Sequence, residues 1–128
     1  MKPYFGHIEQ LTLNNAYFRQ VLYTGQYCQL VVMSLKPGEE IGQEVHKTVD
    51  QFFRIDQGEA KFVINDEEFV AKDGDAVIVP AGTEHNVINT GTQDLKLYTI
   101  YSPPNHPDGT VHKNLAEAMK AEAEEHQH

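Results

Sequence analysis

The chain contains no tryptophan and a single cysteine, Cys28, in 128 residues. One cysteine excludes an internal disulfide and a zinc site built from several thiolates, and it fits a reducing compartment. Cationic residues are also few: ten Lys and Arg stand against 19 Asp and Glu, which gives a net charge of −9. Because such a chain repels phosphate backbones and anionic lipid, roles at nucleic acids and at membrane surfaces are disfavoured.

Long apolar runs are missing as well. The first ten residues, MKPYFGHIEQ, lack the apolar segment of a signal peptide, and no later run approaches the roughly 20 residues that a membrane helix needs. We therefore expect a cytoplasmic protein. The length corresponds to one domain, and we expect residues 1–128 to form it, with no room for a second core.

Strand-forming segments alternate with turn residues along most of the chain. Eight segments rich in Val, Ile, Phe and Tyr lie at 17–23, 29–35, 51–55, 61–64, 67–71, 75–79, 85–89 and 95–101. Short strands at this spacing indicate an all-β antiparallel sandwich or small barrel. Asn65 and Asp66, between two of these segments, predict a tight hairpin turn.

A helix is predicted only at the end of the chain. Asn114 followed three residues later by Glu117 has the order of a capping box, ahead of a run rich in Ala, Glu and Lys. We expect Leu115, Ala118 and Met119 to dock on the barrel. No role is expected for His126 and His128, because a fraying helix end is a poor frame for a metal site.

Polar side chains suited to binding concentrate in residues 37–58 and 74–89. Residues two apart on a strand face the same side, so Glu44 and His46 point together. On the next strand, Arg54 and Asp56 share a face with Asp50, and burying these charges in a small barrel would cost several kcal/mol per unpaired ion.

The alternative face of that strand therefore points inward, and it carries Gln51. His85 begins a later strand and shares a face with Val87, which turns back to the core. His85 is thus a fourth group able to reach the same interior point as Glu44, His46 and Gln51.

The spacing of these groups resembles that of the cupin family. The second cupin motif, G-x5-P-x-G-x2-H-x3-N, is matched at every fixed position, by Gly74, Pro80, Gly82, His85 and Asn89. The first, G-x5-H-x-H-x3,4-E-x6-G, is matched in spacing by Gly38, Glu44, His46, Gln51 and Gly58. Two residue types depart from it: Glu44 replaces the first His, and Gln51 replaces the Glu.

The resemblance implies a single-domain cupin jelly-roll barrel over about residues 17–104, followed by a connector and a short C-terminal helix in 105–128. It also implies one divalent metal in the barrel, held by Glu44, His46, Gln51 and His85. Three His and one Glu carry a ligand charge of −1, and the set found here also sums to −1. Two His and one carboxylate suit Mn, Fe, Ni, Co or Zn better than Mg or Ca.

A competing interpretation is a cupin without metal, in which the four groups bond to each other or to water. Single residues of the interior are expected to be packing rather than substrate contacts, namely Phe53, Ile55, Phe62, Val87 and Leu97. Cys28 is expected to be a small buried residue.

The segment after the last strand, YSPPNHPDGTVH, carries Tyr101, His106, Asp108 and His112. Tyr101 shares a face with Leu95 and Leu97 and is expected to point inward. The segment is either a rigid connector or a cover that supplies a proton-transfer group, because a His with a near-neutral pKa can exchange protons. We predict Glu44, Tyr101 and His106 as catalytic candidates.

Two functional classes remain open. The first is an enzyme acting on a small oxygenated substrate, such as a sugar, uronate or keto acid, by isomerase-like proton transfer or by dioxygenase or decarboxylase chemistry. The second is a non-catalytic module that binds a metal or small ligand. In either case we expect a homodimer, because Phe52, Tyr98 and Ile100 form an outward apolar face.

Overall fold

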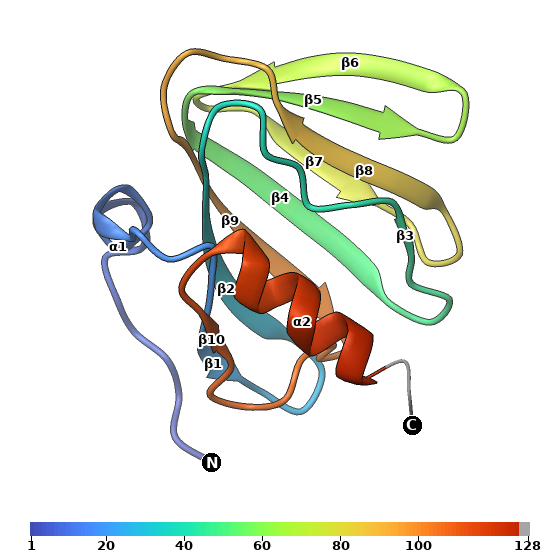
Figure 1. Ribbon diagram of the computed structural model, residues 1–128. Helices are drawn as coiled ribbons and strands as arrows, with labels where there is room; N and C mark the ends of the chain where they lie inside the picture. The colour runs from blue at the N-terminus through green and yellow to red at the C-terminus, as the bar shows by residue number, and fades with distance from the viewer. Residues whose placement is uncertain (126–128) are drawn as a thin grey trace.

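The computed structural model describes residues 1–125, so His126 and His128 lie outside the described residues (Figure 1). The elements in chain order are α1 (Ile8–Asn14), β1 (Arg19–Thr24), β2 (Gln29–Leu35), β3 (Glu44–Val45), β4 (Asp50–Gln57), β5 (Glu59–Ile64), β6 (Glu67–Lys72), β7 (Ala76–Val79), β8 (Glu84–Asn89), β9 (Leu95–Ser102), β10 (Val111–His112) and α2 (Leu115–Glu125). The eight predicted strand segments correspond to β1, β2 and β4 to β9. The fold is mostly β, as expected.

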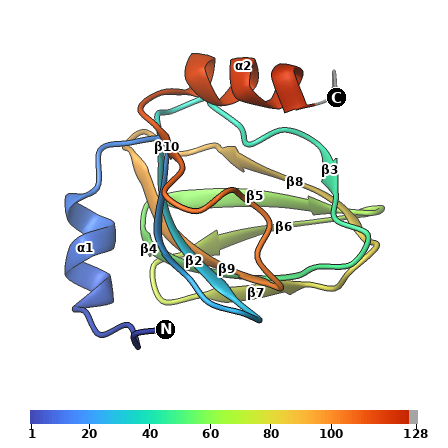
Figure 2. The same cartoon turned by 90° about the horizontal axis from the view of Figure 1, so that it is seen from below.

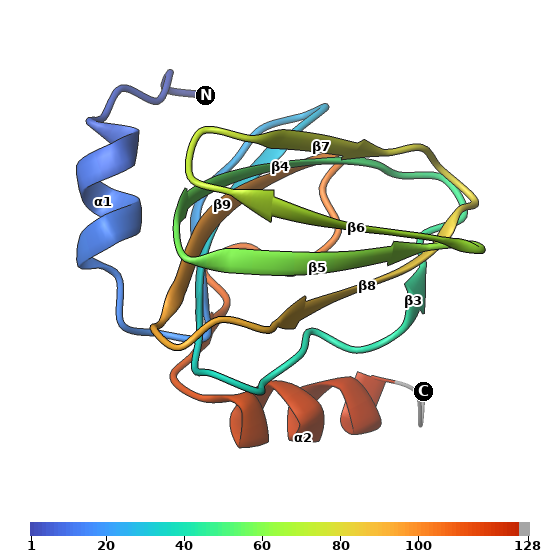
Figure 3. The ribbon, with the colours of Figure 1, turned by 90° about the horizontal axis from the view of Figure 1, so that it is seen from above.

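The strands form two antiparallel sheets that face each other as a jelly roll (Figure 3). The larger sheet has the order β10-β1-β2-β9-β4-β7, and the smaller has the order β3-β8-β5-β6. Strands distant in sequence are neighbours in both sheets, as β2 and β9 are. The motifs around β3, β4 and β8 are brought to the same end of the barrel by this crossing.

The core lies between the sheets and is built from the inward positions of both. The residues expected as interior packing are all within it, since Phe53, Ile55, Phe62, Val87 and Leu97 are at most 1 % exposed. Buried and more exposed side chains alternate along most of β4, because one face of the strand packs against the core. Gln51 lies on the buried face and Asp50 on the outer face. The parity argument for Gln51 is confirmed.

Turn chemistry fixes the strand pairing at two positions. Asn65 adopts a φ of 52°, and with Asp66 it forms the two-residue turn that pairs Ile64 with Glu67. Gly58 has a φ of 89°, and a Cβ there would meet the carbonyl oxygen of Asp94 at 3.1 Å. A side chain at position 58 is therefore excluded by both backbone conformation and space.

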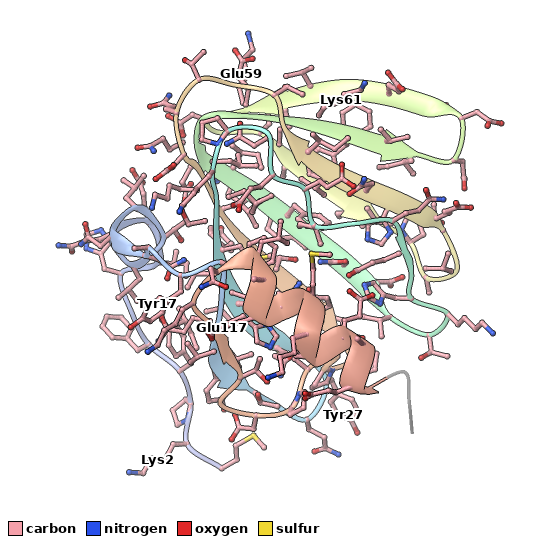
Figure 4. The ribbon with its side chains drawn as sticks, viewed as in Figure 1. Lys2, Tyr17, Tyr27, Glu59, Lys61 and Glu117 are labelled. Carbon is pink, nitrogen blue, oxygen red and sulfur yellow. The ribbon has the colours of Figure 1, made fainter. Side chains whose placement is uncertain are left out.

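Helix α2 is capped as the sequence predicts and lies across one side of the barrel (Figure 2). The Glu117 amide donates to Asn114 Oδ1 at 2.9 Å, and Figure 4 shows Glu117 on the first turn. Ala118 is 6 % exposed and Leu115 packs against the core, but Met119 is 62 % exposed. The expectation that Met119 docks is wrong, because it lies on the solvent side of the helix.

Helix α1 was not predicted, and it changes the surroundings of Asp56. It packs on the outer side of β2, β4 and β9. Thr12 is its only buried residue, so the sequence has no apolar stripe from which the helix could be predicted. Asp56 points away from the barrel interior as expected, yet it is only 8 % exposed because α1 covers it. Burial raises the pKa of Asp56, even though Arg54 lies 3.7 Å away and favours the charged form.

Two further findings concern single residues and spans. Cys28 is exposed, because it lies in the turn between β1 and β2 rather than inside a strand, so the expectation of burial is wrong. Neither helix of the described chain has the length and apolarity needed to cross a membrane.

Candidate metal centre

Glu44, His46 and His85 meet at one end of the barrel. Glu44 on β3 lies directly opposite His85 on β8 in the antiparallel register, so the two side chains share the inner face. His46 follows β3 at the same parity, and its carbonyl accepts a hydrogen bond from the Gly82 amide at 2.8 Å. That bond joins the segment after β3, which carries His46, to the turn before β8, which carries His85.

The ligand-capable atoms of this triad all lie within 4.8 Å of one another. His46 Nε2 lies 2.8 Å from Glu44 Oε2, but it is buried without a properly aligned hydrogen bond. Both atoms instead face a shared point. With metal bonds of roughly 2.0 to 2.2 Å for nitrogen and oxygen ligands, a modest contraction would seat one ion among them.

Gln51 contributes an amide oxygen at the same end. It is 2 % exposed, and its Nε2 donates to Thr99 Oγ1 at 3.0 Å, which directs Oε1 away from that contact. Oε1 is buried and has no hydrogen-bond partner. A buried acceptor without a partner is costly, so Gln51 Oε1 and the neighbouring triad together fit a divalent metal.

The electrostatics favour a neutral His85 and an ionised Glu44. Burial lowers the pKa of His85, and its Nδ1 lies 3.0 Å from the Thr83 carbonyl, which leaves Nε2 as the free lone pair. Burial raises the pKa of Glu44, but His46, Arg19 and His85 outweigh it, and the net shift is downward. These are the protonation states that a metal ligand needs.

Tyr101 and His106 lie beside the triad, and Tyr101 points inward as the sequence predicts. The His46 and Tyr101 rings meet edge-on at 5.8 Å, and His106 Nε2 lies 3.3 Å from Tyr101 Oη. Burial raises the pKa of Tyr101 to about 12 and lowers that of His106 to about 3, the latter also through Arg19. Burial therefore keeps both groups uncharged at neutral pH, and His106 lacks the near-neutral pKa that the proton-transfer interpretation of the connector requires.

Two important residues of this region were missed. Gln29 is fully buried, and its Oε1 accepts from the amides of Asn105 and His106 while its Nε2 donates to the His106 carbonyl. Arg19 is 6 % exposed and lines the same pocket as Glu44 and His46. Neither lies in a motif, and a lone Gln or Arg in a strand carries no signal until its face is known.

A pocket of about 330 Å³ is lined by Glu44 and His46 of the triad, whereas His85 lines a second pocket. The first pocket is also lined by Arg19 on β1, His106 and His112 from the connector and β10, and Ala118 on α2. Figures 2 and 3 show α2 running alongside the segment that leads into β3. The connector and α2 thus border the opening, whereas Asp108 is exposed and is not among the wall residues.

A jelly roll with His and carboxylate side chains converging at one end of the barrel has the architecture of a cupin. The family model for the cupin domain matches residues 31–101, more than half of the chain, so the protein belongs to the cupin family. The expected family and fold are confirmed.

Individual relatives agree. The chain is 50 % identical to the uncharacterised protein YrkC of Bacillus subtilis, over 94 % of this chain and 68 % of YrkC. It superposes on the crystal structure of BH2720 from Bacillus halodurans with a TM-score of 0.91 and 42 % identity, covering 93 % and 95 % of the two chains. A predicted oxalate decarboxylase of Thermotoga maritima is similar at a TM-score of 0.57 and 28 % identity, covering 59 % of this chain and 66 % of the other.

Proposed function

We propose that the protein is a metal-dependent enzyme acting on a small oxygenated substrate, such as a sugar, uronate or keto acid. The observation that carries the proposal is the clustering of Glu44, His46 and His85, whose ligand atoms lie within 4.8 Å of one another, beside the buried Gln51 Oε1, which has no hydrogen-bond partner. Glu44, His46, Gln51 and His85 would hold one divalent transition metal, of the group Mn, Fe, Ni, Co or Zn. When bound, such an ion supplies Lewis acidity to the oxygens of the substrate.

The residues around the site have separate tasks in this proposal. Tyr101 keeps its proton at neutral pH, so its hydroxyl donates a hydrogen bond to a substrate oxygen or to His106. His106 stays unprotonated at neutral pH, but a pKa of about 3 makes it a weak base, so its role is that of a hydrogen-bond acceptor. Glu44 is the one carboxylate of the triad and is the candidate base if it leaves the metal.

Isomerase-like proton transfer is the proposed reaction type, because the Glu44 carboxylate lies in the triad and the Tyr101 hydroxyl, a proton donor, lies beside His46 and His106. A decarboxylase or dioxygenase is the second candidate, and the likeness to the predicted oxalate decarboxylase supports it. The two differ in their products: the first conserves the substrate's mass, whereas the second releases carbon dioxide or consumes oxygen.

The test begins with protein purified without added metal. Elemental analysis should find about one transition metal per chain, and mass spectrometry under native conditions should identify any co-purified substrate. His46→Ala and His85→Ala should lose the metal, whereas His7→Ala, which changes an exposed histidine, should keep it. Equal metal content in all four proteins would refute the site, and a metal-loaded protein that turns over none of a panel of sugars, uronates and keto acids would refute the activity.

A further inference from the structure

Arg19 faces the interior of the barrel, although it is one of only two arginines in a strongly acidic chain. In the strand register it lies directly opposite Met33 of β2 and His112 of β10. Met33 is fully buried in the core, and residues directly opposite each other share a face. The guanidinium therefore reaches the same pocket that Glu44 and His46 line.

The neighbours of Arg19 compensate its positive charge only in part. Its Nη1 donates to His112 Nδ1 at 3.1 Å, and its guanidinium carbon stands 5.4 Å from the centroid of the Phe18 ring. Its Nε is buried with no hydrogen-bond partner. Two groups of the site also interact with Arg19: its charge favours the ionised form of Glu44, and its side chain is a hydrogen-bond partner of Tyr101.

A guanidinium that is more than nine-tenths buried, with an Nε–H that has no hydrogen-bond partner, is an expensive feature for a protein to keep. Its fork of donors is planar and matches an oxyanion in two-point contact. The carboxylates that also line this pocket are Glu44, which the metal would occupy, and Glu122 on α2.

We propose that Arg19 binds a carboxylate of the ligand and thereby sets the specificity of the pocket for small organic acids. This inference rests on the proposed function and narrows it: the ligand would present oxygens to the metal at one end and a carboxylate to Arg19 at the other. A pocket of about 330 Å³ admits only a small molecule. Neutral sugars are excluded as preferred ligands, because they leave the guanidinium unpaired.

A carboxylate fits this pocket better than a phosphate. Arg19 supplies a single positive charge, Glu44 lines the same space, and the chain carries a net charge of −9. A monoanionic group pairs with one guanidinium, whereas the second charge of a phosphate would meet the field of Glu44 and of the chain as a whole.

The experiment measures binding of succinate, neutral succinamide and inorganic phosphate by calorimetry, to both metal-free and manganese-loaded protein. The variants are Arg19→Gln and, as a control with the same loss of charge, Arg54→Gln on the outer face. We expect succinate to bind the wild-type protein and Arg19→Gln to weaken that binding about 10- to 100-fold, in both forms. Arg54→Gln should bind succinate as the wild type does.

A second variant, Arg19→Lys, and an NMR spectrum of the wild-type protein distinguish loss of the carboxylate contact from a folding defect of Arg19→Gln. Arg19→Lys keeps the charge but loses the fork, so it should retain part of the affinity. In the metal-free wild type, the Arg19 Nε–H resonance should shift when succinate is added and should stay unchanged with succinamide.

The proposal is overturned if succinate fails to bind the wild-type protein, if Arg19→Gln and wild type bind it equally, or if succinamide binds as well as succinate. Tighter binding of phosphate would overturn the choice of a carboxylate. Metal content is measured separately on the same samples, so a protein that binds succinate through Arg19 but holds no metal refutes the proposed function and leaves this inference standing.

Discussion

His106 Nε2 and Tyr101 Oη lie 3.3 Å apart, with the two rings edge-on at 5.1 Å, although the residues are separated by a connector that contains two consecutive prolines. The connector after β9 returns to the barrel and is held there by Gln29 of β2. Through its side-chain oxygen and nitrogen, Gln29 holds the backbone of Asn105 and His106. The position of His106 is thus decided by a residue 77 positions away in the chain.

We predict that Gln29→Leu releases this connector. Leucine fills the space but leaves the Asn105 and His106 amides without an acceptor, which should lower the free energy of unfolding by on the order of 2 to 3 kcal/mol. Urea unfolding measures the loss, and hydrogen exchange should quicken at the His106 amide. Gln26→Leu, at an exposed position, is the control and should change neither. Unchanged exchange at His106 would contradict the role given to Gln29.

We predict that Gln51→Glu binds metal at least as tightly as the wild type but binds succinate more weakly. A second carboxylate beside Glu44 adds attraction for a divalent ion, and it repels an anionic ligand and makes the ion a poorer Lewis acid. Calorimetry with manganese and then with succinate checks both parts. Gln26→Glu adds the same charge at the surface and should alter neither. If Gln51→Glu binds succinate as tightly as the wild type or more tightly, the neutral amide of Gln51 is not needed for binding an anionic ligand.

We predict that Asp56→Asn gains stability relative to the wild type as the pH rises from 3 to 7. The pKa of Asp56 is raised from its ordinary 3.8, so the folded state binds the proton more tightly than the unfolded chain does. The wild type therefore loses stability as pH climbs through the interval from 3.8 to the raised pKa, and the amide variant is free of that loss. Urea unfolding at several pH values gives the difference, with the exposed Asp108→Asn as control. A pH-independent difference would refute it.

We predict that metal removal lowers the thermal midpoint. A ligand at 100 times its dissociation constant stabilises the folded state by about 2.7 kcal/mol, which corresponds to roughly 10 °C for a chain of this size. Calorimetric scans before and after chelation measure the shift. His46→Ala should show no shift on chelation, and a shift of equal size in that variant would place the metal elsewhere.

We predict a homodimer formed through the outer face of the larger sheet. Phe52 and Tyr98 contact each other there at 6.1 Å between ring centroids, and Ile78, opposite Phe52, is 66 % exposed. Light scattering should give twice the 14.5 kDa of the chain, and Ile78→Asp should halve that mass. Val70→Asp, on the smaller sheet, should remain dimeric. A wild-type mass of 14.5 kDa would refute the dimer.

The sequence alone determined eight of the ten strands of the described residues, all but the two-residue strands β3 and β10, together with the inward face of β4 and the spacing of the candidate ligands. These depend on local rules: side chains alternate along a strand, charged groups avoid an apolar interior, and a two-residue turn needs a residue such as Asn65 that tolerates positive φ. The same rules predicted Gln51 inward and Asp50 outward before any pairing was known. Helix α2 was likewise predictable, because its cap is contained in four consecutive residues.

Only the tertiary structure decided what surrounds that site. In the sequence, Arg19 has the pattern of a surface charge, and only the pairing of β1 with β2 and β10 shows that it points inward. The role of Gln29 is visible only once the connector is seen to pack against it. Thr12 is buried because α1 packs against strands far away in the sequence, which is also why Asp56 is covered. Burial and partners are set by contacts between distant segments, and no local pattern of residues carries that information.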